Sequence, residues 1–340
     1  MRNKTTDHTT NFFIMEEDRI KTRVVGVDIS NERTTYAIVD IRGNIIAEDS
    51  FVTTDYQDVN NFVSVICEKI LEMVEANGGY ETIRSLGISC PSASFISGNI
   101  VNAPNLPWKG IIPLSAMIRD RLGLAVALAN DAHVAALGEY AFGSAHGMKD
   151  FIIISMGIGL GSCFFSAGHE HQGFEGFAGE FGHTCIQPLG RKCACGKQGC
   201  LEAYVGAKGI VSTANELMKE SDAPSLMRNV ERLTPRIIND FCQQGDEMAI
   251  EVFRRTGEIF GMGLANYASL INPQAIILTG GISHAGKWLL DPTRQAFEDN
   301  IFGNMKGRIK ILVSQLNDRE RDVLGASALA WEVPEYSLFK

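Results

Sequence analysis

The sequence has no hydrophobic stretch long enough to cross a membrane, which requires an apolar run of about 18 residues. Residues 1–22 also lack the apolar centre of a signal peptide and carry acidic side chains instead. We therefore expect residues 1–22 to form a flexible polar leader. We also expect a cytoplasmic protein that has no membrane partner.

Positive charge is scarce in this chain. It has 31 Lys and Arg residues against 40 Asp and Glu residues, which gives a net charge of −9, and no long basic run occurs. Nucleic-acid binding requires clustered lysines and arginines that neutralise phosphates. The composition therefore disfavours a nucleic-acid partner.

Cysteines are few, and their spacing does not resemble that of a small secreted disulfide scaffold. Three of the eight cluster within residues 193–200, and with a nearby histidine they form the set His183, Cys193, Cys195 and Cys200. The Cys-x-x-Cys spacing of a redox pair is absent from this stretch, whereas Gly196 and Gly199 permit tight turns. One histidine and three cysteines are the ligands of a closed, structural zinc site. Reduced thiols without a metal remain the alternative interpretation.

The 340 residues, 45% of them hydrophobic and 21% charged, have the composition of a globular protein and the length of two domains. Strand-like and helix-like patterns alternate along the chain, which predicts α/β architecture with mixed or parallel sheets. We predict strands within 23–30, 34–51, 86–90, 124–131, 151–168, 275–286 and 309–315, and helices at 57–76, 132–143, 205–220, 246–268 and 323–333. A strand–turn–strand segment opens each half, as expected of a two-lobed phosphate clamp.

Polar residues and glycines stand at the predicted element ends. Asp131 follows Asn130 between a strand and a helix, so it is either a helix N-cap or a ligand-binding carboxylate at a strand end. The turn containing Gly157, Gly159 and Gly161 either cradles a phosphate or closes an ordinary hairpin. It lacks both the P-loop lysine and the helix that follows a dinucleotide-binding turn.

The glycine-rich segment 173–183 places Glu180 three residues before His183, so that a single turn can direct both side chains at one ligand. The alternative is that both contact solvent. Proximity to the cysteine cluster favours a site, because a metal that holds His183 also fixes the orientation of Glu180.

Together these motifs resemble the ROK family of repressors and sugar kinases over residues 23–332. The most specific match is GFEGFAGEFGH followed by CACGKQGCLEAY, and NAPNLPW, LANDAHVAALGE, INPQAIILTGGIS and VLGASALA occur in the family's order. The resemblance implies an actin-like ATPase (ribonuclease H-like) fold of two α/β lobes with the active site in the cleft between them. Residues 23–128 with the C-terminal helix 323–340 would form the small lobe, and residues 129–322 would form the large lobe with the sugar, zinc and nucleotide contacts. The resemblance also implies a homodimer or homotetramer.

The resemblance assigns roles to individual residues. Asp131 would be the catalytic base that takes the proton from a sugar hydroxyl. The sugar would be held by Asn105, Asn130, Asp131, Glu180, His183 and Glu202. The nucleotide would be bound at Asp28, Gly157, Gly159, Gly280 and Gly281, with Asp28 near the Mg²⁺ that accompanies ATP. One ring nitrogen of His183 would bind structural Zn²⁺ together with the three cysteines, and the other would face the sugar.

The chain departs from the family pattern on the phosphate side. Kinases of the family usually read D-x-G-G-T in the first hairpin, where this chain has Ser30, Asn31 and Glu32. Ile158 stands at the usual threonine of the second hairpin, and Ser92 stands at a usual glycine. The sugar-binding set, by contrast, is complete.

The leading hypothesis is an ATP-dependent hexose kinase similar to a glucokinase, with a hexose and ATP as substrates. The alternative is a sugar-binding member of the family with weak or lost kinase activity and a regulatory or sensing role, which Glu32 and Ile158 favour. A DNA-binding repressor is disfavoured, because the residues before Arg23 are too few for an added helix-turn-helix domain and the chain is acidic.

Overall fold

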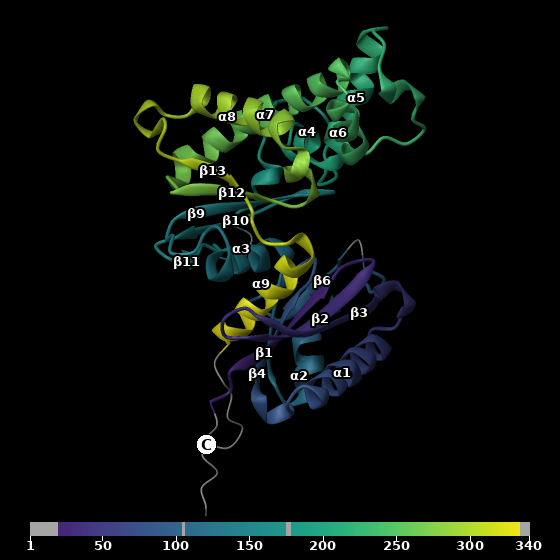
Figure 1. The fold of residues 1–340 in the computed structure, drawn as a ribbon, viewed down its shortest axis with the longest axis vertical. Coiled ribbons are helices and arrows are strands. Elements are labelled where there is room, and N and C mark those ends of the chain that lie inside the picture. The colour runs from purple at the N-terminus through teal and green to yellow at the C-terminus, as the bar shows by residue number, and fades with distance from the viewer. Residues whose placement is uncertain (1–19, 104–105, 175–177, 334–340) are drawn as a thin grey trace, which may run out of the picture.

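The computed structural model describes residues 20–103, 106–174 and 178–333. Most of the predicted leader (residues 1–19), Asn105 and residues 334–340 of the predicted last helix lie outside this part of the chain. Two five-stranded sheets and one three-stranded sheet are present in it, together with the helices (Figure 1). Both large sheets mix parallel and antiparallel strand pairs, which confirms the predicted α/β class.

The first sheet has the strand order β3-β2-β1-β4-β8. Its strands are β1 (Arg23–Ile29), β2 (Arg33–Asp40), β3 (Ile45–Val52), β4 (Ile83–Ser89) and β8 (Ala125–Ala129). β1, β2 and β3 form an antiparallel meander, whereas β4 and β8 run parallel to β1. The parallel strands β1, β4 and β8 therefore end at one edge of the sheet, where α/β proteins commonly bind ligands.

One face of the first sheet is covered by α1 (Val59–Ala76) and α2 (Leu114–Leu122). α1 begins where the side chain of Asp58 accepts a hydrogen bond from the backbone N–H of Asn61. Its buried residues lie three or four positions apart on one face of the helix, and they are Phe62, Val63, Ile66, Cys67, Ile70 and Val74. This periodicity predicted the helix at 57–76, and the structure confirms it. α2 was not predicted.

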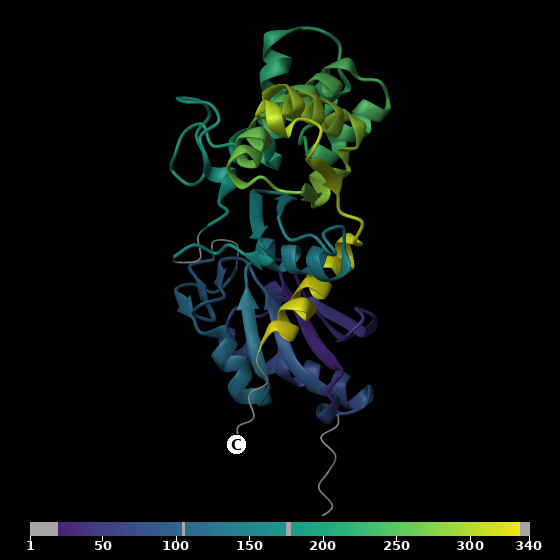
Figure 2. The same ribbon diagram turned by 90° about the vertical axis from the view of Figure 1, so that its left-hand side faces the viewer.

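The opposite face of the first sheet is covered by α9 (Asp318–Glu332), which begins before residue 323, its predicted start (Figure 2). Glycines let the helix lie directly on the strands. A Cβ atom on Gly26 would lie 2.4 Å from the carbonyl oxygen of Val323, and one on Gly87 would lie 2.0 Å from that of Ala326. The position of α9 on β1 and β4 is therefore fixed by backbone contact at Val323 and Ala326.

α3 (Asp131–Phe142) lies between α9 and the second sheet (Figure 1). A Cβ atom on Gly325 would lie 2.2 Å from the carbonyl oxygen of Val134, so α9 and α3 also cross at backbone contact. On its other side, α3 packs against the buried side chains of the second sheet, such as Ile153. The pair of helices therefore connects the two large sheets.

The second sheet has the strand order β11-β10-β9-β12-β13. Its strands are β9 (Phe151–Met156), β10 (Leu160–Ser166), β11 (His169–Glu170), β12 (Ala275–Thr279) and β13 (Lys310–Val313). Its far face is covered by α4 (Glu202–Val205), α5 (Ala207–Glu220), α6 (Pro235–Gln243), α7 (Glu247–Ile271) and α8 (Lys287–Asn300) (Figure 1). The small sheet joins β5 (Ala93–Ser94), β6 (Asn99–Val101) and β7 (Ile111–Ile112).

Several predicted boundaries in the second half are corrected by the structure. The strand predicted over 275–286 ends at Thr279, because Gly280 adopts a φ of 84° and turns the chain into a 3₁₀ segment. The helix predicted at 205–220 is divided between α4 and α5, and α6 and α8 were not predicted. α8 carries Pro292 in its interior, which argues against a helix on sequence alone. No helix in the described ranges is long and apolar enough to cross a membrane.

Candidate active site

Asp28 and Asp131 lie at the edge of the first sheet where the parallel strands end. The strand register aligns Asp28 of β1 with Ser89 of β4, and Ser89 with Ala129 of β8. Asn130 and Asp131 follow Ala129 directly. The strand ends thus bring together two carboxylates that are far apart in the sequence.

Asn130, rather than Asp131, caps α3. Its Oδ1 atom accepts a hydrogen bond of 2.8 Å from the backbone N–H of His133, which is the N-cap arrangement. Asp131 is the first residue of the helix, its side chain is exposed, and its Oδ1 accepts a 2.9 Å hydrogen bond from the neighbouring backbone N–H of Ala132. The N-cap interpretation of Asp131 is therefore wrong, and its carboxylate is available for chemistry.

Burial and neighbouring charges shift the pKa values at this edge. Burial, reinforced by the Asp322 carboxylate, raises the pKa of Asp28 to about 7, although the Arg321 guanidinium opposes the rise. Although water reaches Asp131, the surrounding protein desolvates its carboxyl and raises its pKa above the ordinary value, and Asp322 adds to this rise. Neighbouring carboxyls with raised pKa values are typical of catalytic sites.

Arg321 and Asp322 were not predicted as site residues. They lie near the start of α9, where the Nε atom of Arg321 is 3.0 Å from Oδ1 of Asp322, and Arg321 is 7% exposed. The sequence signal was an Arg-Asp pair directly before the VLGASALA motif. Their proximity to Asp28 depends on how α9 packs over β1, which no local pattern predicts.

Two glycine turns meet at one edge of the second sheet. β9 and β12 are parallel, and Ser155 aligns with Thr279, so that Gly157 and Gly280 leave the sheet side by side. The approach is close, because a Cβ atom on Gly280 would lie 2.5 Å from the carbonyl oxygen of Met156. Only a glycine fits there without displacing the neighbouring strand.

The surroundings of these turns leave room for a ligand. A Cβ atom on Gly281 would have no neighbour within 4 Å. The backbone N–H of Gly157 donates a 3.0 Å hydrogen bond to the carbonyl oxygen of Gly159, which closes the second hairpin. Ile158 between them is 78% exposed, so the tip of the hairpin presents a hydrophobic side chain instead of a hydroxyl.

The start of β10 contacts both Glu202, a predicted sugar-binding residue, and the residue that follows Asp131. The backbone N–H of Leu160 donates a 3.0 Å hydrogen bond to Oε2 of Glu202, the first residue of α4. At the next residue, a Cβ atom on Gly161 would lie 3.5 Å from the Cβ of Ala132, which follows Asp131. The N-terminal ends of α3 and α4 therefore both contact the first residues of β10.

β10 and α7 hold the loop that carries Glu180 and His183. The hydroxyl of Ser162 accepts a 3.1 Å hydrogen bond from the backbone N–H of Phe181. From α7, Tyr267 stacks on Phe181 with ring centroids 4.0 Å apart and donates a hydrogen bond to the Phe181 carbonyl. Glu180 itself is exposed. The loop is thus anchored by β10 and by α7 at Phe181, the residue directly after Glu180.

The predicted zinc ligands converge. The ligand atoms of His183, Cys193, Cys195 and Cys200 all lie within 4.8 Å of one another. The Nδ1 atom of His183 is 3.7 Å from Sγ of Cys193, and Sγ of Cys195 is 3.6 Å from that of Cys200. Zinc–sulfur bonds of about 2.3 Å in a tetrahedron place sulfur atoms roughly 3.7 Å apart. The four residues therefore fit a structural zinc ion.

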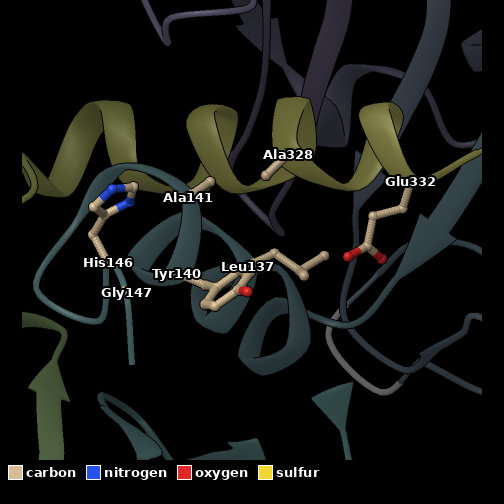
Figure 3. Close-up of a pocket in the computed structure, with 7 residues that line it drawn as sticks. All are labelled: Leu137, Tyr140, Ala141, His146, Gly147, Ala328 and Glu332. Atoms are coloured by element: carbon tan, nitrogen blue, oxygen red, sulfur yellow. The ribbon is translucent and has the colours of Figure 1, made fainter. Parts of the chain in front are cut away.

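The cysteine loop also adjoins Glu202, because Sγ of Cys193 is 3.6 Å from Oε1 of that residue. A cavity of about 330 Å³ lies beside them, lined in part by Ile158, Lys192 and Lys208. A second cavity, of about 380 Å³, lies between the C-terminal halves of α3 and α9 (Figure 3). None of the predicted site residues lines this second cavity.

The structure therefore assembles three groups from the predicted residues. They are the carboxylates with Asn130, the glycine turns, and the zinc set with Glu202. No hydrogen bond or ion pair among the described residues joins Asp131 directly to Glu180 or His183. Asn105 lies outside the described residues.

Known proteins resemble this chain over nearly all of its length. A glucokinase of Streptomyces coelicolor is 31% identical over 319 residues, which cover 91% of this chain and 97% of that protein. A xylose repressor of Caldicellulosiruptor bescii is 29% identical, and the match covers 92% of this chain and 80% of the repressor. The crystal structure of a ROK family glucokinase from Streptomyces griseus, in complex with glucose and AMPPNP, is 32% identical with a TM-score of 0.74 and covers 92% of this chain and 100% of that one. Because the profile of the ROK family also matches residues 24–333, the chain belongs to the ROK family.

Proposed function

We propose that the protein is an ATP-dependent sugar kinase that transfers the γ-phosphoryl group to a hydroxyl of a hexose, with glucose as the first substrate to test. The observation that carries this proposal is the position of the Asp131 carboxylate. It does not cap α3, because Asn130 does so, and the next residue, Ala132, lies close to Gly161 at the start of β10. The similarity to glucokinases over most of the chain supports the same activity.

In this mechanism, Asp131 acts as the general base. It accepts the proton of the sugar hydroxyl while the hydroxyl oxygen attacks the γ-phosphorus in line, and the bond from the γ-phosphorus to the bridging oxygen breaks to release ADP. The raised pKa of Asp131 makes its carboxylate a stronger base than an ordinary aspartate. Exclusion of water is needed as well, because an open site would hydrolyse ATP.

The residues that would bind the sugar lie in segments that contact β10. Asn130, Glu180, His183 and Glu202 would bind the sugar hydroxyls, together with Asn105. His183 turns Nδ1 toward the cysteines, which leaves Nε2 for a hydroxyl. A structural zinc ion would fix the histidine in this orientation and supply no catalytic step.

On the nucleotide side, Asp28 would hold the Mg²⁺ that accompanies ATP and neutralises phosphate charge. A carboxylate at a strand end has the oxygen ligands that Mg²⁺ prefers. The open space at Gly281 and the close approach at Gly280 suit a nucleotide against the backbone of the second sheet.

The two sheets with their helices would be the two lobes of an actin-like fold, 23–128 with the last helix and 129–322, and the substrates would bind in the cleft between them. A homodimer or homotetramer stays a prediction. Three cysteine ligands must be reduced to bind zinc, which favours the cytoplasm.

A second candidate function is sugar binding with weak or lost kinase activity. The first hairpin favours it, because the backbone N–H groups of Ser30 and Arg33 are already bonded within the turn, to the Arg33 carbonyl at 3.0 Å and the Ser30 hydroxyl at 3.1 Å. These groups are therefore not available to a phosphate. Glu32 in the same turn is exposed and would repel one.

A coupled assay of ATP turnover over several hexoses, with Mg²⁺ and zinc-loaded protein, tests the proposal. The unmodified chain should phosphorylate at least one hexose, and Asp131→Ala should reduce kcat by about 10²–10⁴-fold while calorimetric sugar affinity changes little. Asn130→Ala is a second variant that removes the helix cap but keeps the base. Sugar binding without turnover of any hexose would reject the kinase and favour the second candidate.

A further inference from the structure

The first turn of α9 lies against the phosphate side of the proposed site. Alternate residues of β1 face α9, so Asp28 faces the same side of the sheet as Gly26. The backbone of Val323 lies directly on Gly26, where a Cβ atom would be 2.4 Å from its carbonyl oxygen. Arg321 and Asp322 immediately precede Val323, and this register brings them next to Asp28.

Arg321 is a buried cation in a group of acids. It is 7% exposed and forms two contacts with Asp322, at 3.0 Å from Nε to Oδ1 and 3.4 Å from Nη2 to Oδ2. Its guanidinium favours the ionised forms of Asp28 and Asp131, whereas Asp322 disfavours both. Charged side chains are rarely buried to this extent unless neighbouring charges compensate them.

ATP adds more negative charge to the same place. In the first hairpin, Glu32 is exposed and the backbone N–H groups of Ser30 and Arg33 are already bonded, and the second hairpin presents Ile158 at its tip. Phosphoryl transfer depends on preorganised positive charge near the transferred group. Among the residues that surround Asp28 and Asp131, Arg321 provides such a charge.

We propose that Arg321 is a positioning residue for phosphoryl transfer: it offsets the repulsion between the carboxylates of this site and the ATP phosphates, and Asp322 holds its guanidinium in place. The inference rests on the proposed kinase function. Arg321 acts through the charge of Asp28 and Asp131, so it is distinct from the catalytic base. It substitutes for phosphate contacts that the first and second hairpins do not provide.

Opposite charge changes at adjacent residues test this role. Arg321→Gln should weaken binding of a non-hydrolysable ATP analogue with Mg²⁺ by about tenfold or more, and Asp322→Asn should strengthen it. Glucose affinity should stay within about twofold in both variants, because the sugar-binding segments are held by β10. Arg321→Lys keeps the charge and should stay closer to the unmodified chain than Arg321→Gln.

Arg119→Gln is the matched control, because Arg119 also pairs with the following residue, Asp120, but on the exposed surface of α2. It should leave both affinities unchanged. If Arg321→Gln does not fold, the analogue affinities of Asp322→Asn and Arg321→Lys are compared instead. Asp322→Asn removes a negative charge and should bind the analogue more tightly, whereas Arg321→Lys keeps the positive charge and should stay close to the unmodified chain. The inference is overturned if Arg321→Gln binds the analogue normally, or if folded Arg321 and Asp322 variants lose affinity for the analogue and for glucose alike.

Binding measurements separate this inference from the proposed activity. A chain that binds the analogue with the expected charge dependence but phosphorylates no hexose would retain the role of Arg321 in nucleotide binding and reject only the kinase. An unmodified chain that binds no ATP analogue at all would overturn both.

Discussion

The backbone N–H of Leu160 donates a 3.0 Å hydrogen bond to Oε2 of Glu202, and this contact ties the second glycine hairpin to the helix that follows the cysteine cluster. The fit is tight, because a Cβ atom on Gly159 would lie 2.7 Å from the same carboxylate oxygen. One carboxylate thus lies between the proposed nucleotide turn and the proposed zinc site. Its second oxygen lies 3.6 Å from Sγ of Cys193.

Changing Glu202 should separate its structural role from sugar binding. Glu202→Gln retains an oxygen that can accept the Leu160 hydrogen bond but removes the charge, so we expect glucose affinity to fall by about 10- to 100-fold with little change in melting temperature. This corresponds to about 1.5–3 kcal/mol for a hydrogen bond to a charged group. Calorimetry and thermal melting measure the two effects. Glu75→Gln, at an exposed carboxylate of α1, is the control, and an unchanged sugar affinity in Glu202→Gln would contradict the assigned role.

Zinc removal should weaken sugar binding and the fold together. Cys195→Ser removes one of four ligands, so the metal content should fall and His183 should lose its fixed orientation. We expect a lower melting temperature and a sugar affinity reduced by about tenfold or more. Metal analysis, thermal melting and calorimetry on one preparation measure these changes.

The matched control for the zinc prediction is Cys185→Ser. Cys185 lies in the same loop and is exposed, but it is not among the four converging ligands. That variant should keep its zinc and its sugar affinity. Normal sugar binding by zinc-free protein would refute the link between the metal and the site.

The pKa of Asp28 makes a prediction about stability. Its folded-state pKa of about 7 is higher than that of an unfolded aspartate, so the folded protein holds this proton more tightly. The stability contributed by the protonated carboxyl is complete below the unfolded pKa and is lost as the pH rises toward 7. Asp28→Asn, which mimics the protonated form, should therefore raise the melting temperature more at pH 8 than at pH 5.

Asp49→Asn provides a control of opposite sign. The backbone N–H of Ser50 and the hydroxyl of Tyr36 lower the pKa of Asp49, so its ionised form stabilises the fold above the unfolded pKa. This variant should destabilise the protein more at pH 8 than at low pH, where the native carboxyl is protonated. Identical pH dependence in the two variants would contradict the burial argument for Asp28.

Local sequence patterns predicted the elements with regular periodicity and the motifs within short segments. α1 was predicted from its helical hydrophobic spacing, and the zinc ligands from their residue types and their spacing. The meeting of Asp28 with Arg321 and Asp322 was not predictable, because it requires β1 and α9, which are almost the whole chain apart, to pack in one register. α8 was missed because Pro292 hides its helical pattern.

One departure from the family pattern proved to be compatible with the backbone. Ser92, which stands at a usual glycine, adopts a φ of 57°, the left-handed conformation that favours glycine. The backbone at Ser92 thus has the conformation that glycine favours, although the residue is a serine. The hydroxyl missing at Ile158 is a different kind of departure, because it removes a chemical group that could contact a phosphate.

Ile158→Thr distinguishes the two candidate functions. Ile158 is 78% exposed, so the substitution should not reduce stability, and the new hydroxyl stands at the tip of the glycine hairpin where it can donate a hydrogen bond to a phosphate oxygen. A hydrogen bond to a charged group contributes about 1.5–3 kcal/mol, so we expect kcat/KM for ATP to rise by about tenfold. Ile41→Thr, at an aliphatic side chain that is 63% exposed and far from the hairpin in the sequence, is the control and should change nothing. An unchanged kcat/KM in Ile158→Thr would mean that this hairpin does not contact phosphate and that the loss of the hydroxyl is no reason to expect a weak kinase.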